Sequence, residues 1–259
     1  MNPHSTRCPA TPTPDEPSSV ARMPAEDPEA QRIQRVYAGY AARGAAESKW
    51  SLANPGNAAM REERMRVLAR TLGRAGFASL KNRKILEIGC GQGRVLGELA
   101  ALGAAPSLLS GVDLLPDRIE SARRACPLAD LRVADARSLP FAAGSFDLVA
   151  AFTVFSSILD PEIARNIARE MDRVLKPGGA AVCYDFKYNN PRNPSVRGVR
   201  RSSLESCFPG FSCHWQSLTL LPPLARNLGA LTAFAYPVLA AIAPLRTHFL
   251  GLLVKPVAR

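Results

Sequence analysis

The stretch "KILEIGCGQGRVL", residues 84–96, decides the fold of this chain. A short apolar run ends at the acid Glu87, and Gly89, Gly91 and Gly93 then occupy every second position. The pattern predicts a buried strand, a tight turn and the start of a helix. Glycines in such a turn permit positive φ angles and let a ligand approach the backbone closely. The helix start adds free N–H donors, so we expect a ligand to bind at this turn.

Outward from this stretch, strand patterns alternate with helical patterns along the chain. The strand-like runs cover residues 84–90, 108–115, 129–136, 146–154 and 180–186, with helical patterns at 92–102, 116–126 and 160–175. Buried strands joined by helices indicate parallel strands with right-handed crossovers. The sequence therefore predicts a doubly wound α/β fold, with two more strands at 211–220 and 247–255.

The two ends of the chain differ from this central pattern. Residues 1–28 are rich in proline and poor in large apolar residues, which predicts a disordered tail. Residues 29–80 are predicted to form N-terminal helices that cover the site, and residues 81–259 form the core domain. Within this core an apolar helical insert is expected at about 222–246, with no charge between Arg226 and Arg246. We interpret the insert as core or lid helices, with contact to a membrane surface or a lipid substrate as the alternative.

The overall composition limits the possible classes of protein. A net charge of +11 would suit an anionic partner, but the densest basic run, residues 191–201, is interpreted as a solvated face. The six cysteines are scattered without a C-x-x-C pair, which argues against a zinc site or a disulfide framework. No charged-then-apolar leader precedes the helices, so we expect a cytoplasmic protein.

The spacing of the glycines distinguishes between nucleotide ligands. Dinucleotide-binding turns follow G-x-G-x-x-G, whereas this chain has G-x-G-x-G and places Arg94 where the third glycine would stand. Glu87 precedes the turn, and its carboxylate would repel a pyrophosphate but suit an ammonium group. Both features favour S-adenosylmethionine, which lacks phosphate and carries a positively charged amino acid end.

Four segments in order resemble the class I S-adenosylmethionine-dependent methyltransferases, in particular the small-molecule group of the ubiquinone-biosynthesis type. They are "ILEIGCGQG", "GVDLLPDRIESAR", "VADARSLPF" and "FDLVAAFTVFSSILD" with the following "RVLKPGG". The resemblance covers about residues 30–190. It implies a seven-stranded sheet of order 3-2-1-4-5-7-6 with an antiparallel last strand and helices on both faces.

The resemblance also implies a cofactor site. Asp113 would hold the ribose hydroxyls and Asp135 would face the adenine amine, while Leu114 and Leu139 are placed to flank the ring. The residues expected to bind the cofactor are Glu87, Gly89, Cys90, Gly91, Gly93, Asp113, Leu114, Asp135, Ala136 and Phe152.

Fewer sequence motifs indicate the residues that would bind the methyl acceptor. The chain lacks the Asp-Asp-Asn metal set of catechol-type enzymes and the N/D-P-P-Y motif of nucleic-acid enzymes, so no metal is expected. Ser156 and Ser157 stand where many relatives carry a histidine. Asp185, at the end of the fifth strand, is therefore the candidate base or acceptor-orienting group. The candidate substrate contacts are Tyr37, Tyr40, Tyr188 and His214.

These features predict a methyltransferase that modifies an O or N atom of a small-molecule, glycan or lipid-like intermediate. The apolar insert favours a hydrophobic acceptor and would permit peripheral membrane contact. An RNA methyltransferase is the first alternative, motivated by the basic charge, although no RNA-binding module is found. A non-catalytic cofactor-binding scaffold is the second. The sequence does not predict an oligomeric state.

Overall fold

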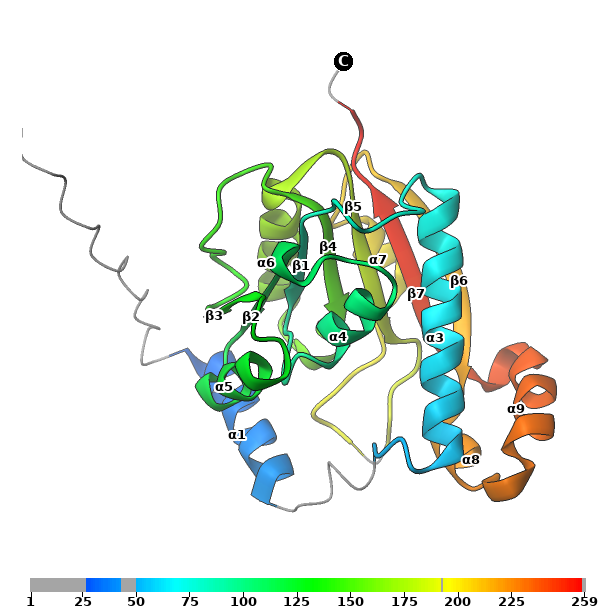
Figure 1. Cartoon of the computed structure of the whole chain (residues 1–259). Coiled ribbons are helices and arrows are strands. Elements are labelled where there is room, and N and C mark those ends of the chain that lie inside the picture. The colour runs from blue at the N-terminus through cyan, green and yellow to red at the C-terminus, as the bar shows by residue number, and fades with distance from the viewer. Residues whose placement is uncertain (1–26, 43–49, 192, 258–259) are drawn as a thin grey trace, which may run out of the picture.

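A seven-stranded mixed sheet forms the centre of the protein (Figure 1). The computed structural model describes residues 27–42, 50–191 and 193–257. The sheet order is β3-β2-β1-β4-β5-β7-β6, in which β7 is antiparallel to both of its neighbours and the first five strands are parallel. This topology confirms the predicted strand order. The strands are β1 (Ile85–Ile88), β2 (Leu109–Asp113), β3 (Asp130–Val133), β4 (Phe146–Phe152), β5 (Leu175–Phe186), β6 (Ser212–Leu220) and β7 (Arg246–Val254).

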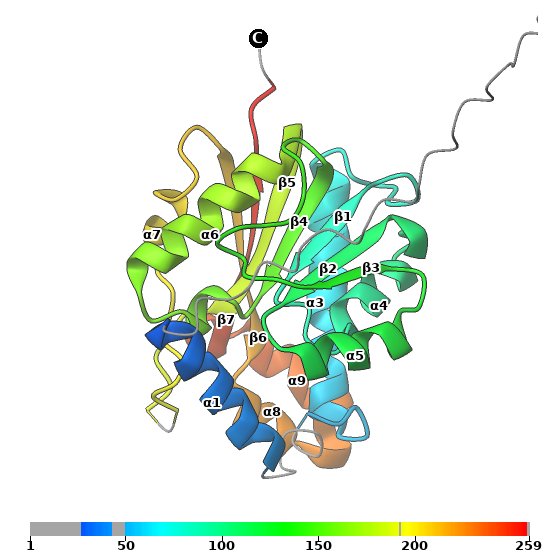
Figure 2. The same ribbon diagram turned by 90° about the vertical axis from the view of Figure 1, so that its left-hand side faces the viewer.

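Helices cover both faces of the sheet (Figure 2). One face carries α3 (Pro55–Arg74), α4 (Arg94–Ala101) and α5 (Pro116–Ala125), and the other carries α6 (Pro161–Val174) and α7 (Arg201–Glu205). Alternate strand residues belong to the two cores, so Ile85 packs in the α3–α5 layer and Leu86 in the α6–α7 layer. Short 3₁₀ turns η1 (Pro106–Leu108) and η2 (Phe155–Ser157) occur in the connections.

Helix α1 (Pro28–Ala42) lies at the carboxyl ends of the parallel strands (Figure 2). Asp27 caps it, because its Oδ1 accepts hydrogen bonds from the backbone N–H groups of Glu29 and Ala30 at 2.9 and 3.1 Å. The tail predicted at residues 1–28 lies outside the described residues except for Asp27 and Pro28.

The insert before β7 is helical, as the sequence predicts. It comprises α8 (Pro222–Arg226), η3 (Gly229–Leu231), α9 (Thr232–Ala241) and η4 (Ala243–Leu245). Tyr236 and Ala240 of α9 pack with Met60 of α3 in a small core of their own. None of the helices described, across residues 27–42, 50–191 and 193–257, is long and apolar enough to cross a bilayer.

Strand β5 begins earlier than the sequence indicates. The prediction starts this strand at residue 180, whereas the structure starts it at Leu175, directly after α6. Leu175 pairs with Phe146, and the register then shifts before Leu148 pairs with Ala180. Gly178, with φ of 74°, lies in this irregularity. Gly178 therefore marks a bulge inside the strand.

Candidate functional site

A cavity opens at the carboxyl ends of β1, β2 and β4, which is where ligands bind in doubly wound sheets. Its floor is formed by residues at the ends of these strands and by the segment after β3. Side chains from η2 and α6 form one wall, and α1 covers the opening. The cavity thus joins segments from residue 29 to residue 167.

The glycine turn after β1 has the conformation that the sequence predicts. Gly89, Gly91 and Gly93 have φ angles of 65°, 54° and 81°, in the region that favours glycine. Gly89 lines the cavity, and Gly93 caps α4. A Cβ atom on Gly93 would lie 3.2 Å from the Cys126 sulfur, so this residue also permits α4 and α5 to pack closely.

Asp113 lies at the edge of the cavity, at the end of β2. Its Oδ2 accepts from the N–H of Gly91 at 2.8 Å and its Oδ1 accepts from the N–H of Leu115 at 3.0 Å. The guanidinium of Arg118 is 3.9 Å from Oδ2. A carboxylate has about four acceptor positions, so Asp113 keeps capacity for a vicinal diol after these bonds. Its observed geometry fits the ribose contact.

Glu87 is buried beneath the turn with 2% exposure. Its Oε2 has no hydrogen-bond partner among the described residues. Burial raises the pKa of this carboxyl well above its usual range, and the nearby Glu98 adds to the shift. An unpaired buried carboxyl is costly. A cationic ammonium would satisfy it, and this is the group at the amino acid end of the expected cofactor. The neighbouring Cys90 is buried against Gly111 and does not line the cavity.

Asp135 lines the cavity together with Ala136 and Leu114. Its Oδ2 accepts from Nε and Nη2 of Arg137 at 2.9 and 2.5 Å. Arg137 also forms an ion pair with Asp27, just ahead of α1. Asp135, the acid expected to face adenine, is therefore linked through Arg137 to the start of α1.

The apolar wall of the cavity differs from the predicted one. Leu139 is buried in the core and does not line the cavity, whereas Ile158, Ile163 and Ile167 do. The helical spacing of Ile163 and Ile167 in the sequence indicates only a face turned to the protein interior. The distinction between core and cavity depends on α1, whose position the sequence does not specify.

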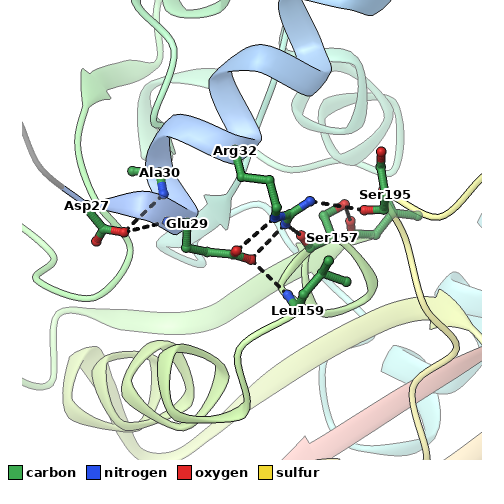
Figure 3. Close-up of polar contacts among 8 residues, drawn as sticks. Asp27, Glu29, Ala30, Arg32, Ser157, Leu159 and Ser195 are labelled. Atoms are coloured by element: carbon green, nitrogen blue, oxygen red, sulfur yellow. Dashed lines mark hydrogen bonds and ion pairs between the residues drawn. The ribbon is translucent and has the colours of Figure 1, made fainter.

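Helix α1 is held over the cavity by a cluster of polar contacts (Figure 3). Arg32 donates two hydrogen bonds to Glu29 at 2.7 Å each, and Glu29 accepts from the N–H of Leu159 at 2.8 Å. Arg32 also donates to the carbonyl oxygens of Ser157 at 2.5 Å and Ser195 at 3.4 Å. These contacts connect α1 both to η2 and to the segment after β5.

The structure brings only one of the four predicted substrate residues to the cavity. Tyr37 lines it, with its ring 4.1 Å from the guanidinium of Arg118. Tyr40 is hydrogen-bonded to Asn193 outside it, and Tyr188 is half exposed. His214 is exposed on the edge strand β6, opposite Leu252, so this prediction is not supported.

Asp185, the predicted base, does not line the cavity either. It is fully buried, and its carboxylate accepts from the N–H groups of Ser156 and Phe186 at 3.1 and 3.0 Å. Burial raises its pKa to about 7. Alternation along β5 turns Asp185 toward η2, whereas Tyr184 turns toward Phe152. The geometry assigns Asp185 to holding η2, which forms a wall of the cavity.

Thr153 is a cavity residue that no sequence motif indicates. It lines the cavity with a φ of 56°, which is rare for a β-branched residue and typical of functional sites. Its N–H donates to the Tyr184 carbonyl oxygen at 2.7 Å. Phe152, one of the residues expected to bind the cofactor, lines the cavity, and the guanidinium carbon of Arg64 lies 5.5 Å from its ring centre.

His248 is the buried histidine of this region. Its ring stacks on Tyr184 at 4.8 Å and bonds the Thr247 hydroxyl at 2.9 Å. Burial lowers its pKa to about 3, so the ring is neutral at physiological pH. No group of three metal-ligating side chains occurs within residues 27–42, 50–191 and 193–257.

Comparison with known proteins agrees with this geometry. A sequence model of the family described as "Methyltransferase domain" matches residues 85–179. Demethylmenaquinone methyltransferase of Chlorobaculum parvum is 32% identical over 132 residues, which are 51% of this chain and 52% of that protein. Fatty-acid O-methyltransferase of Mycolicibacterium smegmatis is 37% identical over 107 residues, 40% of this chain and 38% of that protein. The chain thus spans about half or less of these relatives.

A solved structure shares the fold over most of its length. The S-adenosylmethionine-dependent methyltransferase of Mesorhizobium loti matches with a TM-score of 0.53 and 20% identity, over 70% of this chain and 95% of that one.

Proposed function

Because residues 85–179 form a methyltransferase domain and the whole sheet has the class I S-adenosylmethionine-dependent topology, we propose that the protein transfers a methyl group from S-adenosylmethionine to a hydrophobic small molecule. The observation that supports this most strongly is the joint position of Gly89, Asp113 and Asp135 around one cavity. The three residues come from separate strands and meet only through the fold.

In this proposal Asp113 accepts hydrogen bonds from the ribose hydroxyls, and Asp135 accepts from the adenine amine. Glu87 is buried beneath the glycine turn and does not itself line the cavity; the amino acid end would bind at this turn, where the unpaired Glu87 oxygen complements its ammonium group. The cofactor, when bound, supplies an electrophilic methyl group on a sulfonium. The protein contributes orientation and exclusion of water, and α1 covers the opening for this purpose.

The class of acceptor is inferred from the wall and from the relatives. Ile33, Ile158 and Ile163 give one side of the cavity an apolar surface. The names of the two relatives refer to demethylmenaquinone and to fatty acids, both of which have long apolar portions. A hydrophobic acceptor of this kind fits the wall better than a polar one.

The cofactor assignment is tested with Asp113→Asn and the matched control Asp117→Asn. Asp117 is an exposed acid in the first turn of α5, close to Asp113 in the chain, and does not line the cavity. Loss of charged hydrogen bonds at Asp113 should weaken S-adenosylhomocysteine binding by about 1–3 kcal/mol, whereas the control should bind like the wild type. Isothermal titration calorimetry measures both. Equal affinities in the two variants would contradict the ribose assignment.

The acceptor class is tested with methyl-labelled S-adenosylmethionine and a fractionated cell extract. We expect label in the fraction soluble in organic solvent. Label confined to RNA would instead support the alternative substrate, and affinity for that RNA should then fall steeply with salt. Binding of S-adenosylhomocysteine without label in any fraction would contradict the enzymatic proposal and favour a scaffold.

A further inference from the structure

The outer face of the insert has the reverse of the polarity expected for a helix in water. Leu231, Phe234, Val238 and Ile242 follow one another at helical spacing with exposures of 65%, 80%, 67% and 47%. We call these four residues the apolar stripe. The polar side chains of α9, Thr232 and Tyr236, are the buried ones. A helix facing water normally shows its polar side chains outward.

No charged or polar side chain interrupts this surface. Between Gly229 and Pro244 the exposed residues are Gly229, Ala230, Leu231, Ala233, Phe234, Pro237, Val238, Ala241, Ile242, Ala243 and Pro244. Exposed apolar patches of this kind mark interaction sites. A protein partner is usually held by roughly one hydrogen bond per 100–200 Å² of interface, and this face offers no side-chain donors or acceptors. A hydrocarbon phase requires none.

The insert is fixed to the body of the protein, so the orientation of the stripe is defined. The Tyr236 hydroxyl donates to Glu63 of α3 at 2.7 Å, and Arg246 donates to the Ala240 carbonyl oxygen at 2.5 Å. The side-chain amide of Asn54 also donates a hydrogen bond to the Arg226 carbonyl oxygen at 3.1 Å. These bonds hold both ends of the insert.

The position and charge of this region indicate the partner. Helices α8 and α9 lie at the same end of the sheet as α1 and the covered cavity (Figures 1 and 2). From Phe186 to Arg246, the stretch that contains α7, β6 and the insert, the sequence has seven lysines and arginines and one acid, Glu205. Such a charge balance complements an anionic surface.

We propose that the apolar stripe docks the protein on the surface of an anionic lipid bilayer, with the cavity facing the membrane. Helix α9 has ten residues, which span about 15 Å, and the hydrocarbon core is about 30 Å thick. The helix therefore lies in the interface and does not cross it. Docking in this orientation would bring the cavity to a lipid-soluble acceptor, a consequence that rests on the proposed function; the docking itself does not.

The test is flotation of the full chain with vesicles of phosphatidylcholine alone or mixed with phosphatidylglycerol. We expect binding to the mixed vesicles that decreases with salt. The double variant Phe234→Ser/Val238→Ser should reduce the partition coefficient by roughly tenfold or more. The matched control is Leu128→Ser, because Leu128 is 68% exposed but precedes β3 at the other end of the strands. It should bind like the wild type.

Other outcomes would overturn the proposal. Absence of vesicle binding by the wild type at low salt would do so, as would equal binding by the double variant. A dimer that the double variant abolishes, seen by analytical ultracentrifugation without vesicle binding, would identify the stripe as a contact between two copies. Affinity for S-adenosylhomocysteine is measured on every variant, and its retention separates failure of docking from failure of the proposed function.

Discussion

Tyr184 and Asp185 are neighbours in the chain but face opposite layers of the molecule. Tyr184 lies in the α3–α5 layer, where its ring packs on Phe152 at 5.6 Å and on His248. Asp185 lies toward η2 and binds the N–H of Ser156. The sequence identifies a polar residue at the end of a strand, but which face it takes depends on the pleat. A shift of one residue in the register of β5 would exchange the layers that the two side chains face.

The burial of Asp185 makes a specific prediction for stability. The pKa of Asp185 is about 7 in the folded protein, whereas the usual value for an aspartate side chain is 3.8. Below about pH 4 the carboxyl is protonated in both states. As the pH rises from about 4 to about 7, the unfolded chain loses this proton while the folded protein keeps it, so the free energy of unfolding falls by at most about 1.4 kcal/mol per pH unit. Above about pH 7 the carboxyl is ionised in both states, and its contribution to the free energy of unfolding no longer changes with pH.

Asp185→Asn removes this contribution, and urea unfolding from about pH 5 to about pH 7 measures it. The stability of the wild type relative to the variant should decrease as the pH rises. Other buried groups, such as Glu87 and His248, are present in both proteins and cancel in the difference. The variant also alters two hydrogen bonds. The prediction therefore concerns the slope against pH of the difference in unfolding free energy between the two proteins, and not the size of that difference at one pH. A difference that is constant with pH would contradict it.

At the scale of elements, α1 is the part that turns an open edge of the sheet into a covered cavity. It supplies Glu29, Ala30, Ile33 and Tyr37 to the lining. Its sequence predicts an amphipathic helix but does not indicate what the apolar side of α1 packs against. The contacts that place it come from distant segments, such as the carbonyl oxygens of Ser157 and Ser195. Local patterns cannot predict such contacts.

Removing the Arg32 side chain should loosen this cover. Arg32→Ala loses charged hydrogen bonds to Glu29 and the bonds to two carbonyl oxygens, so we expect faster amide exchange in residues 28–42 and about tenfold faster release of S-adenosylhomocysteine. Hydrogen exchange and stopped-flow fluorescence measure the two effects. The control is Arg35→Ala, because Arg35 is exposed and its hydrogen bond to the Gln31 carbonyl oxygen stays within α1. Equal release rates in both variants would show that Arg32 does not hold the cover.

At the scale of the whole molecule, the sequence predicts the sheet well because the central strands β1, β2 and β4 are buried on both faces and give continuous apolar runs. Six strands lie within one residue of their predicted runs, whereas β5 begins five residues before its run, and the resemblance supplies the strand order. The site is predicted less completely. Asp113 and Asp135 follow from motifs, whereas Arg118, Arg137 and Thr153 reach the cavity only through tertiary packing. His214 and His248 are indistinguishable in the sequence, yet one is exposed and the other buried.

The junction between the insert and the body is also invisible in the sequence. Gly56 lies in the first turn of α3, where a Cβ atom would be 2.1 Å from the carbonyl oxygen of Ala225 in α8. This contact is between backbone groups, which cannot move aside without shifting a helix. Gly73 lies in the same helix, and a Cβ atom there would meet nothing within 4 Å. Neither glycine has a positive φ.

The two glycines should therefore respond to the same substitution in opposite ways. Gly56→Ala should lower the free energy of unfolding by about 1–3 kcal/mol or more, since α8 must move away from α3. Gly73→Ala should raise it by up to about 1 kcal/mol through helix propensity alone. Urea denaturation compares the two variants with the wild type. If the insert docks the protein on lipid, Gly56→Ala should also weaken vesicle binding while the apolar stripe is unchanged in sequence. Equal stabilities of the two variants would mean that the insert is not held to α3 at this contact.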